Sequence, residues 1–394
     1  MTSRLYFDDP ALLDFDATVV ACDAHADGAR VALDRSAFYP TSGGQPHDTG
    51  VLIADGQALA VTDVVADDEG VVWHALAGPI APGRKVQGRV DAARRQDFRQ
   101  QHSGQHILSA AFDARVGART ESVHLGVDAC TIDLHREVDA DECLQAEAAA
   151  NVVVWEDRPV AIRYADAADL VAEPRLRKQT LRTGRVRLVD VEGHDLSACG
   201  GTHVTRTGEV GMIVLRGTER FRGGTRVTFL CGRRALESHR DLRDCGDAAA
   251  RALSVSVGDL PQAVERLRDD LRTEQRRSRD LAARLVELQV ASLAQQVSAD
   301  GTLVAHLPDA DAQAVRLAAS HLVSATGRVV ALLAGDAPHA LVVARSADRT
   351  DVDAGAVVRQ ACATFGGKGG GRPDLAQAGG VAATPEQLRA LLRS

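Results

Sequence analysis

Two short histidine and cysteine motifs, about 100 residues apart, constrain the fold of this chain most strongly. The first, HSGQH, runs from His102 to His106, and the second, CGGTH, runs from Cys199 to His203. Four-residue spacing on a helix places the two imidazoles of the first motif on one face, one turn apart. The two glycines of the second motif allow a tight turn that brings a thiolate and an imidazole together. If both motifs hold one metal ion, these distant segments must meet in space.

Three imidazoles and one thiolate suit zinc by ligand softness and by geometry. Each motif alone is weak evidence, because histidines four apart on a helix also arise by chance. The alternative is that these are ordinary buried or surface residues without a metal. From the pair we predict one zinc ion per chain, with the ligands His102, His106, Cys199 and His203.

The apolar pattern predicts an α+β protein that begins with a β-barrel-like subdomain over residues 1–90. Short apolar runs such as ATVVACD, ARVALD and GVVWHAL are broken there by turn-forming residues, which is typical of a small barrel or sandwich. From Asp91 the apolar positions change to helical spacing, and Gly117 can end that helix. Strand-like and helix-like segments follow, so we expect an α+β zinc-binding domain over residues 91–240.

Residues 250–298 are expected to form a helical, coiled-coil-like linker. Two groups of apolar residues share one seam of a helix over residues 259–297, and Glu274 and Ser278 interrupt it; the seam residues are Leu260, Val264, Leu267, Leu271, Leu281, Leu285 and Leu288. A homodimer through this helix is one interpretation, and a single helix packed on its own domain is the other. Residues 300–394 are expected to form an α/β domain that contains a glycine-rich stretch.

Composition narrows the class of protein. The chain has 394 residues and a formal net charge of −8, which argues against a globally basic nucleic-acid binder. A local basic run, RLRKQTLRTGRVR from Arg175 to Arg187, can still contact backbone phosphate, although a solvated loop is the alternative. The seven cysteines are scattered along the chain with no paired spacing, which suits a reducing compartment. The acidic N-terminus lacks a signal-peptide pattern and no apolar run is long enough for a membrane span, so we expect a cytoplasmic protein without a membrane partner.

A glycine-rich loop, FYPTSGGQP, precedes the first metal motif in the chain. Small hydroxyls and backbone N–H groups in such a loop can approach a ligand closely. It is not a phosphate-binding Walker loop, because no GK[ST] follows. Taken by itself, the loop is more simply read as a turn.

Together these motifs resemble a known family. FYPTSGGQPHDTG, RQQHSGQHILSAAF, DLSACGGTHV, TGEVGMIVLR and GGTRVTFLCGRRAL are similar to the editing region of alanyl-tRNA synthetase and to the free-standing AlaX editing proteins. FGGKGGGRPDLAQAGG resembles the C-terminal domain that these synthetases share with DHH-type phosphoesterases. A full synthetase would carry an aminoacylation module before the editing part, whereas the β-rich segment here starts near Met1. The resemblance therefore implies the long form of AlaX.

The resemblance implies hydrolysis of the ester that joins a wrong amino acid, chiefly serine, to tRNA-Ala, with glycine as a second candidate. Serine exceeds alanine by one hydroxyl, and a small amino-acid pocket rejects such an analogue poorly. A second site that removes the wrong amino acid is therefore needed. By this resemblance Thr41 and Gln45 are candidate catalytic residues, and the candidate substrate-binding residues are Ser42, Gly43, Gly44, Lys368 and Arg372. Ser42 departs from the glycine that is commoner in the family, which leaves open which hydroxyl reads serine. Lys368 and Arg372 could touch tRNA phosphate, or their glycine-rich surroundings could serve a tight fold.

Two other functions remain open at this stage. The chain could be a non-catalytic tRNA-binding or synthetase-interaction protein with a purely structural zinc. It could also act on mischarged tRNA-Thr, since threonyl-tRNA synthetases carry a related zinc-motif domain. The C-terminal glycine-rich segment argues against the threonine system, because the resemblance ties that segment to the alanine system.

Overall fold

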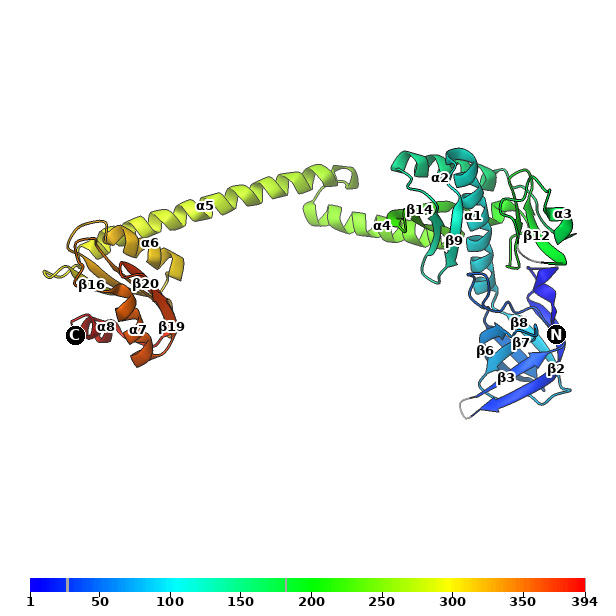
Figure 1. Cartoon of the computed structure of the whole chain (residues 1–394), viewed down its shortest axis with the longest axis horizontal. Coiled ribbons are helices and arrows are strands. Elements are labelled where there is room, and N and C mark those ends of the chain that lie inside the picture. The colour runs from blue at the N-terminus through cyan, green and yellow to red at the C-terminus, as the bar shows by residue number, and fades with distance from the viewer. Residues whose placement is uncertain (26–27, 181–182, 394) are drawn as a thin grey trace. The chain divides into compact units, whose positions relative to one another are not determined.

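The N-terminal strands close into a six-stranded barrel, as the β-rich pattern predicts (Figure 1). The computed structural model describes residues 1–25, 28–180 and 183–393. Neighbouring strands of the barrel are antiparallel and follow the order β2-β3-β7-β6-β5-β8. The elements of this region are β1 (Ser3–Arg4), η1 (Leu5–Phe7), β2 (Asp14–His25), β3 (Gly28–Leu33), β4 (Arg35–Ser36), β5 (Gly50–Ala54), β6 (Gln57–Ala66), β7 (Val72–Leu76) and β8 (Lys85–Val90).

The barrel interior follows from the alternation of side chains along each strand. In β8 every second residue is buried, so Val86 and Val90 face the interior. Aliphatic side chains such as Leu33, Leu52 and Val64 fill most of this core. Such a core is the one expected of a chain with 3% aromatic residues.

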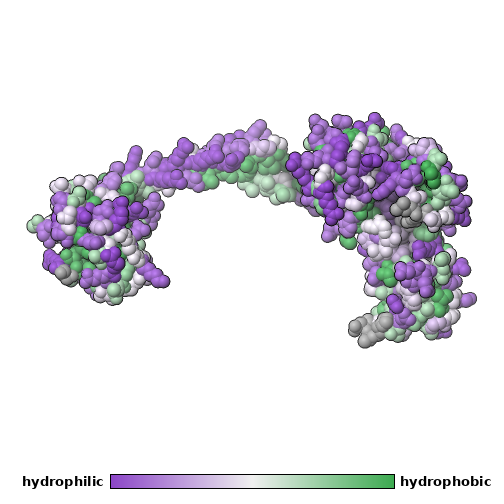
Figure 2. Space-filling view, viewed as in Figure 1, coloured by the Kyte–Doolittle hydropathy of each residue, from purple (hydrophilic) through white to green (hydrophobic). Residues whose placement is uncertain are grey.

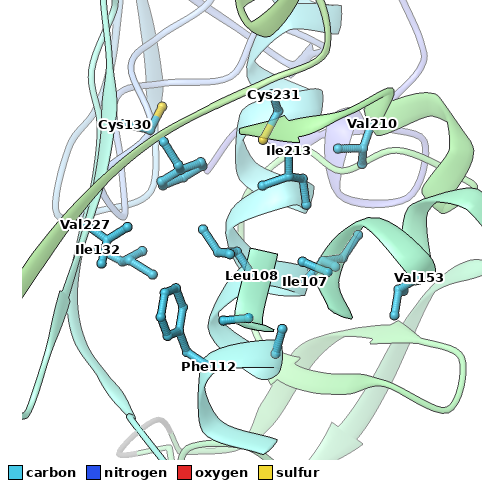
Figure 3. Close-up of a cluster of buried hydrophobic side chains, with 14 of the residues drawn as sticks. Ile107, Leu108, Phe112, Cys130, Ile132, Val153, Val210, Ile213, Val227 and Cys231 are labelled. Carbon is cyan, nitrogen blue, oxygen red and sulfur yellow. The ribbon is translucent and has the colours of Figure 1, made fainter. Parts of the chain in front are cut away.

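Helix α1 (Ala92–Val116) begins and ends where the sequence predicts. The Asp91 side chain accepts hydrogen bonds from the N–H groups of Ala93 and Arg94, which caps the first turn. Gly117, with a φ of 63°, adopts the left-handed conformation that ends helices. Ile107, Leu108 and Phe112 belong to one buried apolar cluster that also takes in Ile132 and Val227 (Figure 3).

Helix α1 packs against elements that come later in the chain. A four-stranded antiparallel sheet has the order β14-β15-β10-β9, and a three-stranded antiparallel sheet has the order β11-β12-β13. The elements are β9 (Thr120–Leu125), β10 (Cys130–Leu134), α2 (Ala140–Trp155), β11 (Val160–Asp166), α3 (Ala167–Leu170), β12 (Arg185–Val191), β13 (Asp195–Ala198), η2 (Thr207–Val210), β14 (Ile213–Phe221) and β15 (Gly224–Cys231).

A buried ion pair joins α1 to the barrel region. The Arg95 guanidinium contacts the Asp48 carboxylate, and the two side chains are 1% and 0% exposed. Arg95 also donates to the carbonyl oxygens of Pro10 and Leu12. An unpaired charge would be very costly at this depth, so these contacts fix the start of α1 against the N-terminal segment. Both histidines of the first motif follow on the same helix.

The chain divides into two units, residues 1–248 and 249–394. The long helix expected over residues 259–297 is present as α5 (Leu260–Ala294); it follows α4 (Gly232–Leu253) and η3 (Val257–Asp259). Whether α5 takes part in a coiled coil stays a prediction. None of the helices in the described residues is both long enough and apolar enough to cross a membrane.

The second unit contains a five-stranded sheet of order β16-β17-β18-β20-β19. Its first pair is parallel and the others are antiparallel. Together with its helices this sheet forms the α/β segment expected over residues 300–394. The elements are β16 (Thr302–Leu307), α6 (Ala312–Leu322), β17 (Val329–Ala334), β18 (His339–Arg345), α7 (Ala354–Phe365), β19 (Lys368–Gly371), β20 (Leu375–Val381) and α8 (Pro385–Leu391).

Candidate metal centre

The two motifs converge in space, as their use as one ligand set requires. Helix α1 carries His102 and His106, and strand β13 leads directly into Cys199 and the turn to His203. One potential ligand atom from each of the four lies within 4.8 Å of the others. The Cys199 Sγ is 3.3 Å from the Nε2 atoms of both His102 and His203. The three imidazoles are 5% exposed or less, and Cys199 is partly exposed.

Each imidazole has its own partner on the side away from the cluster. The Nδ1 of His102 is 2.8 Å from Gln45 Oε1, and the Nδ1 of His106 is 2.9 Å from Asp195 Oδ2. The Nδ1 of His203 is 3.2 Å from the hydroxyl of Ser103. Outer partners of this kind fix the ring orientation and the tautomer of a metal-binding histidine. With Nδ1 engaged, each ring is left with Nε2 for a metal ion.

The turn of the second motif is held by arginines from two elements. The Arg187 guanidinium donates to the carbonyl oxygens of Cys199 and Gly201, at 2.7 and 3.2 Å. From α1, the Arg99 Nε donates to the carbonyl of His203 at 2.8 Å. Arg187 is almost fully buried, and its positive charge also interacts with the Cys199 thiolate.

Electrostatics favours the protonation states that a metal ion needs at Cys199 and His203, but not at His106. Burial favours the neutral thiol, but the imidazoles of His102 and His203 outweigh it and hold the pKa of Cys199 well below its usual value. Burial, followed by the charge of His102, lowers the pKa of His203 to about 3. Metal ions bind thiolates and neutral imidazoles. For His106, burial opposes protonation, yet hydrogen bonds to Asp195 and Cys199 raise its pKa to about 9, so metal binding must displace a proton there.

A cavity of about 530 Å³ opens on one side of the cluster. Three of the four ligand residues, His102, His106 and Cys199, line it. A second cavity of about 580 Å³ shares five of its lining residues, namely Thr120, Glu121, Arg177, Lys178 and Gln179. Residues 176–180 of the basic run therefore contribute to the walls of the two cavities. Residues 181–182 of the run lie outside the described ranges.

The donor set fits a metal ion. Three nitrogens and one sulfur in a buried cluster with bonded outer partners are typical of zinc, in kind and in number. The open side matters because four protein ligands alone would resemble a closed structural site. Here a molecule in the cavity can approach the position that the four ligand atoms surround.

Comparison with known proteins gives three family matches along the chain. The model described as tRNA synthetases class II (A) matches residues 11–94, the threonyl and alanyl tRNA synthetase second additional domain matches residues 186–228, and the DHHA1 domain matches residues 300–394. The alanine–tRNA ligase of Natronomonas pharaonis is 33% identical over 417 residues, which cover 100% of this chain and 44% of that protein. The ligase of Halobacterium salinarum is 35% identical, covering 96% of this chain and 42% of that protein.

The chain is an AlaX-like relative of the alanyl-tRNA synthetase editing region. It spans less than half the length of the curated relatives described above. Among solved structures, the C-Ala domain from Aquifex aeolicus alanyl-tRNA synthetase matches 23% of this chain and 87% of that structure, with 28% identity and a TM-score of 0.21.

The residues of the glycine-rich loop in this AlaX-like chain differ in exposure: Gln45 is buried, whereas Thr41, Ser42 and Gly43 are exposed. Gln45 is fully buried and its amide contacts His102 and Thr202. Gly43 is the residue of this loop that lines the cavity. The Thr41 hydroxyl bonds with His47, and Ser42 is exposed. Roles of Thr41, Ser42, Gly44 and Gln45 toward an amino acid thus stay predictions, and the geometry places Gln45 behind a metal ligand.

The two C-terminal candidates lie at the ends of strand β19. Lys368 is exposed, and Arg372 pairs with Asp374 at 3.0 Å while its side chain stays 78% exposed. Between them, a Cβ at Gly369 or Gly371 would lie 2.3 to 2.8 Å from atoms of β20. Close packing of β19 on β20 accounts for these glycines. Contact of Lys368 and Arg372 with tRNA stays a prediction.

Several residues around the centre were missed by sequence reasoning. Asp195, Ser103 and Arg187 each touch a candidate ligand residue, but nothing in the spacing of Ser103 or Arg187 indicates that contact. For Asp195 the spacing does carry a signal, because residues 195, 197 and 199 alternate along a strand and so share a face.

Proposed function

We propose that this chain is a trans-editing hydrolase that removes serine from mischarged Ser-tRNA-Ala at a zinc site. The observation that carries the proposal is the cavity against the buried ligand cluster, which three of the four ligand residues line. Kinship with alanyl-tRNA synthetases over almost the whole chain supports the substrate class. Glycine on tRNA-Ala is a second candidate substrate.

The reaction is hydrolysis of an ester. Water adds to the ester carbonyl carbon, the bond from that carbon to the ribose oxygen breaks, and a proton passes to the ribose oxygen. A bound zinc ion supplies Lewis acidity, which can polarise the carbonyl or lower the pKa of a water. In this chain, Gly43 and residues 120–123 of β9 line the cavity where the aminoacyl group would lie.

The basic segment supports a nucleic-acid substrate. Arg177, Lys178 and Gln179 line both cavities, and Arg119 lines the one farther from the ligands. Although the whole chain is acidic, positive side chains here would meet the phosphates of an incoming tRNA end. Glu121 lines the same walls, which limits the excess of positive charge.

The decisive experiment is a panel of aminoacylated tRNAs offered to the zinc-loaded protein. We expect fast release of serine from Ser-tRNA-Ala, survival of Ala-tRNA-Ala, and little action on mischarged tRNA-Thr. Removing zinc with a chelator should abolish the release, and adding zinc should restore it. If the zinc-loaded protein leaves Ser-tRNA-Ala intact, the proposal is wrong.

Cys199→Ala separates the enzyme from a tRNA-binding protein with a structural zinc. A variant that folds and binds tRNA but no longer hydrolyses the ester supports the enzyme. Cys245→Ala is the matched control, because Cys245 is an exposed cysteine on α4. If Cys199→Ala only unfolds the domain while the intact protein never hydrolyses any ester, the structural role is favoured.

The proposal also includes a homodimer formed through α5 and the C-terminal unit. Six apolar residues of α5 are between 44% and 68% exposed, namely Val264, Leu267, Leu271, Leu281, Leu285 and Leu288. Figure 2 shows hydrophobic colour along one side of this helix. Such a stripe is typical of a helix that pairs with another.

A further inference from the structure

The outer partners of the three histidines differ in chemical strength. His102 and His203 contact a neutral amide and a neutral hydroxyl, whereas His106 contacts the carboxylate of Asp195. The Asp195 side chain is 0% exposed, so this carboxylate has no water to share. Hydrogen bonds to an ionised acceptor are about twice as strong as bonds between neutral groups.

Two further side chains fix the Asp195 carboxylate. The Arg177 Nε lies 2.6 Å from Oδ1, and the Ser197 hydroxyl lies 3.1 and 2.9 Å from the two carboxylate oxygens. Arg177 also donates from Nη2 to the Ser197 hydroxyl at 3.1 Å. These contacts leave the carboxylate little freedom to rotate away from His106.

An ionised carboxylate accepts hydrogen bonds and cannot donate them. The proton on His106 must therefore sit on Nδ1 whenever the ring is neutral, and Nε2 is then free to bind a metal ion. The amide oxygen of Gln45, which also accepts from the Thr202 N–H, places the proton of His102 on Nδ1 in the same way, whereas the Ser103 hydroxyl can also donate to His203. Among the three outer partners, only Asp195 is a carboxylate.

Arg177 also belongs to the segment that lines both cavities. Its own backbone N–H donates to the carbonyl of Leu196 at 3.0 Å, so the segment is tied to strand β13 next to Asp195. Arg177 also lines the cavity that His102, His106 and Cys199 line. One residue thus contacts the outer partner of a candidate ligand and forms part of the wall that would face substrate.

We propose that Asp195 is a positioning residue for the metal ligand His106, and that Arg177 positions Asp195 while it anchors the segment beside the cavity. The catalytic part of this inference rests on the proposed function, whereas the part on metal binding does not. Neither residue touches the reacting ester in this scheme.

The first test compares Asp195→Asn with Asp190→Asn. Asp190 is a matched control, because it is also buried, it pairs with Arg163 and Arg175, and it lies opposite Leu196 on strand β12. It contacts no ligand residue through any bond found in the described chain. We expect Asp195→Asn to weaken zinc binding about 10- to 100-fold in a chelator competition, and Asp190→Asn to leave it within about twofold.

Replacing zinc with cobalt supplies a spectrum of the metal site, which a simple loss of protein stability does not change. With Co²⁺ in place of zinc, Asp195→Asn should shift the visible ligand-field bands, while Asp190→Asn should retain the bands of the unaltered protein. Equal loss of zinc affinity in both variants, or an unchanged spectrum in Asp195→Asn, overturns the positioning role.

Arg177→Gln tests the coupling to the cavity wall. With zinc saturating, we expect this variant to raise KM for Ser-tRNA-Ala and to lower kcat, because it removes a positive charge from the cavity wall and frees Asp195. Asp195→Asn should lower kcat with little change in KM. If Arg177→Gln changes KM alone, its link to Asp195 is refuted; if no protein hydrolyses the ester but Asp195→Asn still loses zinc affinity, the proposed function fails and the positioning role stands.

Discussion

At the scale of single residues, the second motif contains two adjacent glycines with different surroundings. A Cβ at Gly201 would lie 2.1 Å from Cε1 and 2.3 Å from Nδ1 of His102. A Cβ at Gly200 would meet Phe7 at 3.8 Å, which is ordinary contact. Neither glycine has a positive φ, so backbone strain does not separate them. Only Gly201 is required by the close approach of a ligand.

We therefore expect Gly201→Ala to displace the His102 ring and to weaken zinc binding at least about tenfold, by analogy with the loss of an outer partner. Gly200→Ala should bind zinc almost as tightly as the unaltered protein. Isothermal titration against a competing chelator measures both affinities. Equal affinities in the two variants would mean that the loop can move away from His102.

The sequence predicted the four residues that the structure brings together, but not the groups behind them. Spacing within a motif reports on local geometry, and both motifs are local. Gln45 lies 57 residues before His102 and Asp195 lies 89 residues after His106, so their contacts depend on the tertiary fold. Gln45 was selected by resemblance as a catalytic candidate, and only the structure places its amide against His102.

At the scale of elements, prediction succeeded where end signals and periodicity agree. Helix α1 has both an acidic cap and a terminal glycine, and the barrel strands have clear alternation. Helix α4 was not predicted as one element, because its frequent charged residues obscure the few buried positions such as Ala235 and Ala250.

The barrel strand β7 contains a buried histidine that predicts a pH dependence of stability. His74 is fully buried between the Ser36 hydroxyl, at 2.8 Å, and the Val31 carbonyl, at 3.1 Å. Burial lowers its pKa from 6.5 to about 4, and the bond to Val31 opposes that shift. Between these values the unfolded chain binds a proton that the folded barrel does not, so stability falls as the pH falls.

The expected contribution is about 2 kcal/mol between pH 7 and pH 5. His74→Gln should be less stable at pH 7, because it replaces a buried and hydrogen-bonded ring. It should lose less stability on acidification, because glutamine does not titrate. Urea unfolding can be followed by Trp73 fluorescence after Trp155→Phe, because the chain has two tryptophans. Parallel pH profiles in the two proteins would show that the folded barrel protonates His74 as readily as the unfolded chain does, and would contradict the prediction.

At the scale of the whole molecule, the exposed seam of α5 needs an explanation. The helix has 35 residues, of which Ala263, Val286 and Leu293 are buried. Three exposed ion pairs at i,i+3 spacing lie on its polar faces. Such pairs stabilise an isolated helix by only a few tenths of a kcal/mol each, so packing of the apolar seam must supply most of the stability of a long helix in water.

We expect a second copy of the chain to supply that packing. Leu271→Glu should then weaken the dimer at least about tenfold, since it places a charge in an apolar seam. Thr273→Glu is the matched control, because it introduces the same side chain two residues away, which is about 200° around the helix. Sedimentation velocity over a range of protein concentrations measures both. A monomeric unaltered protein at micromolar concentration, or equal dissociation of the two variants, contradicts pairing through the seam and leaves α5 as a helix supported by its own unit.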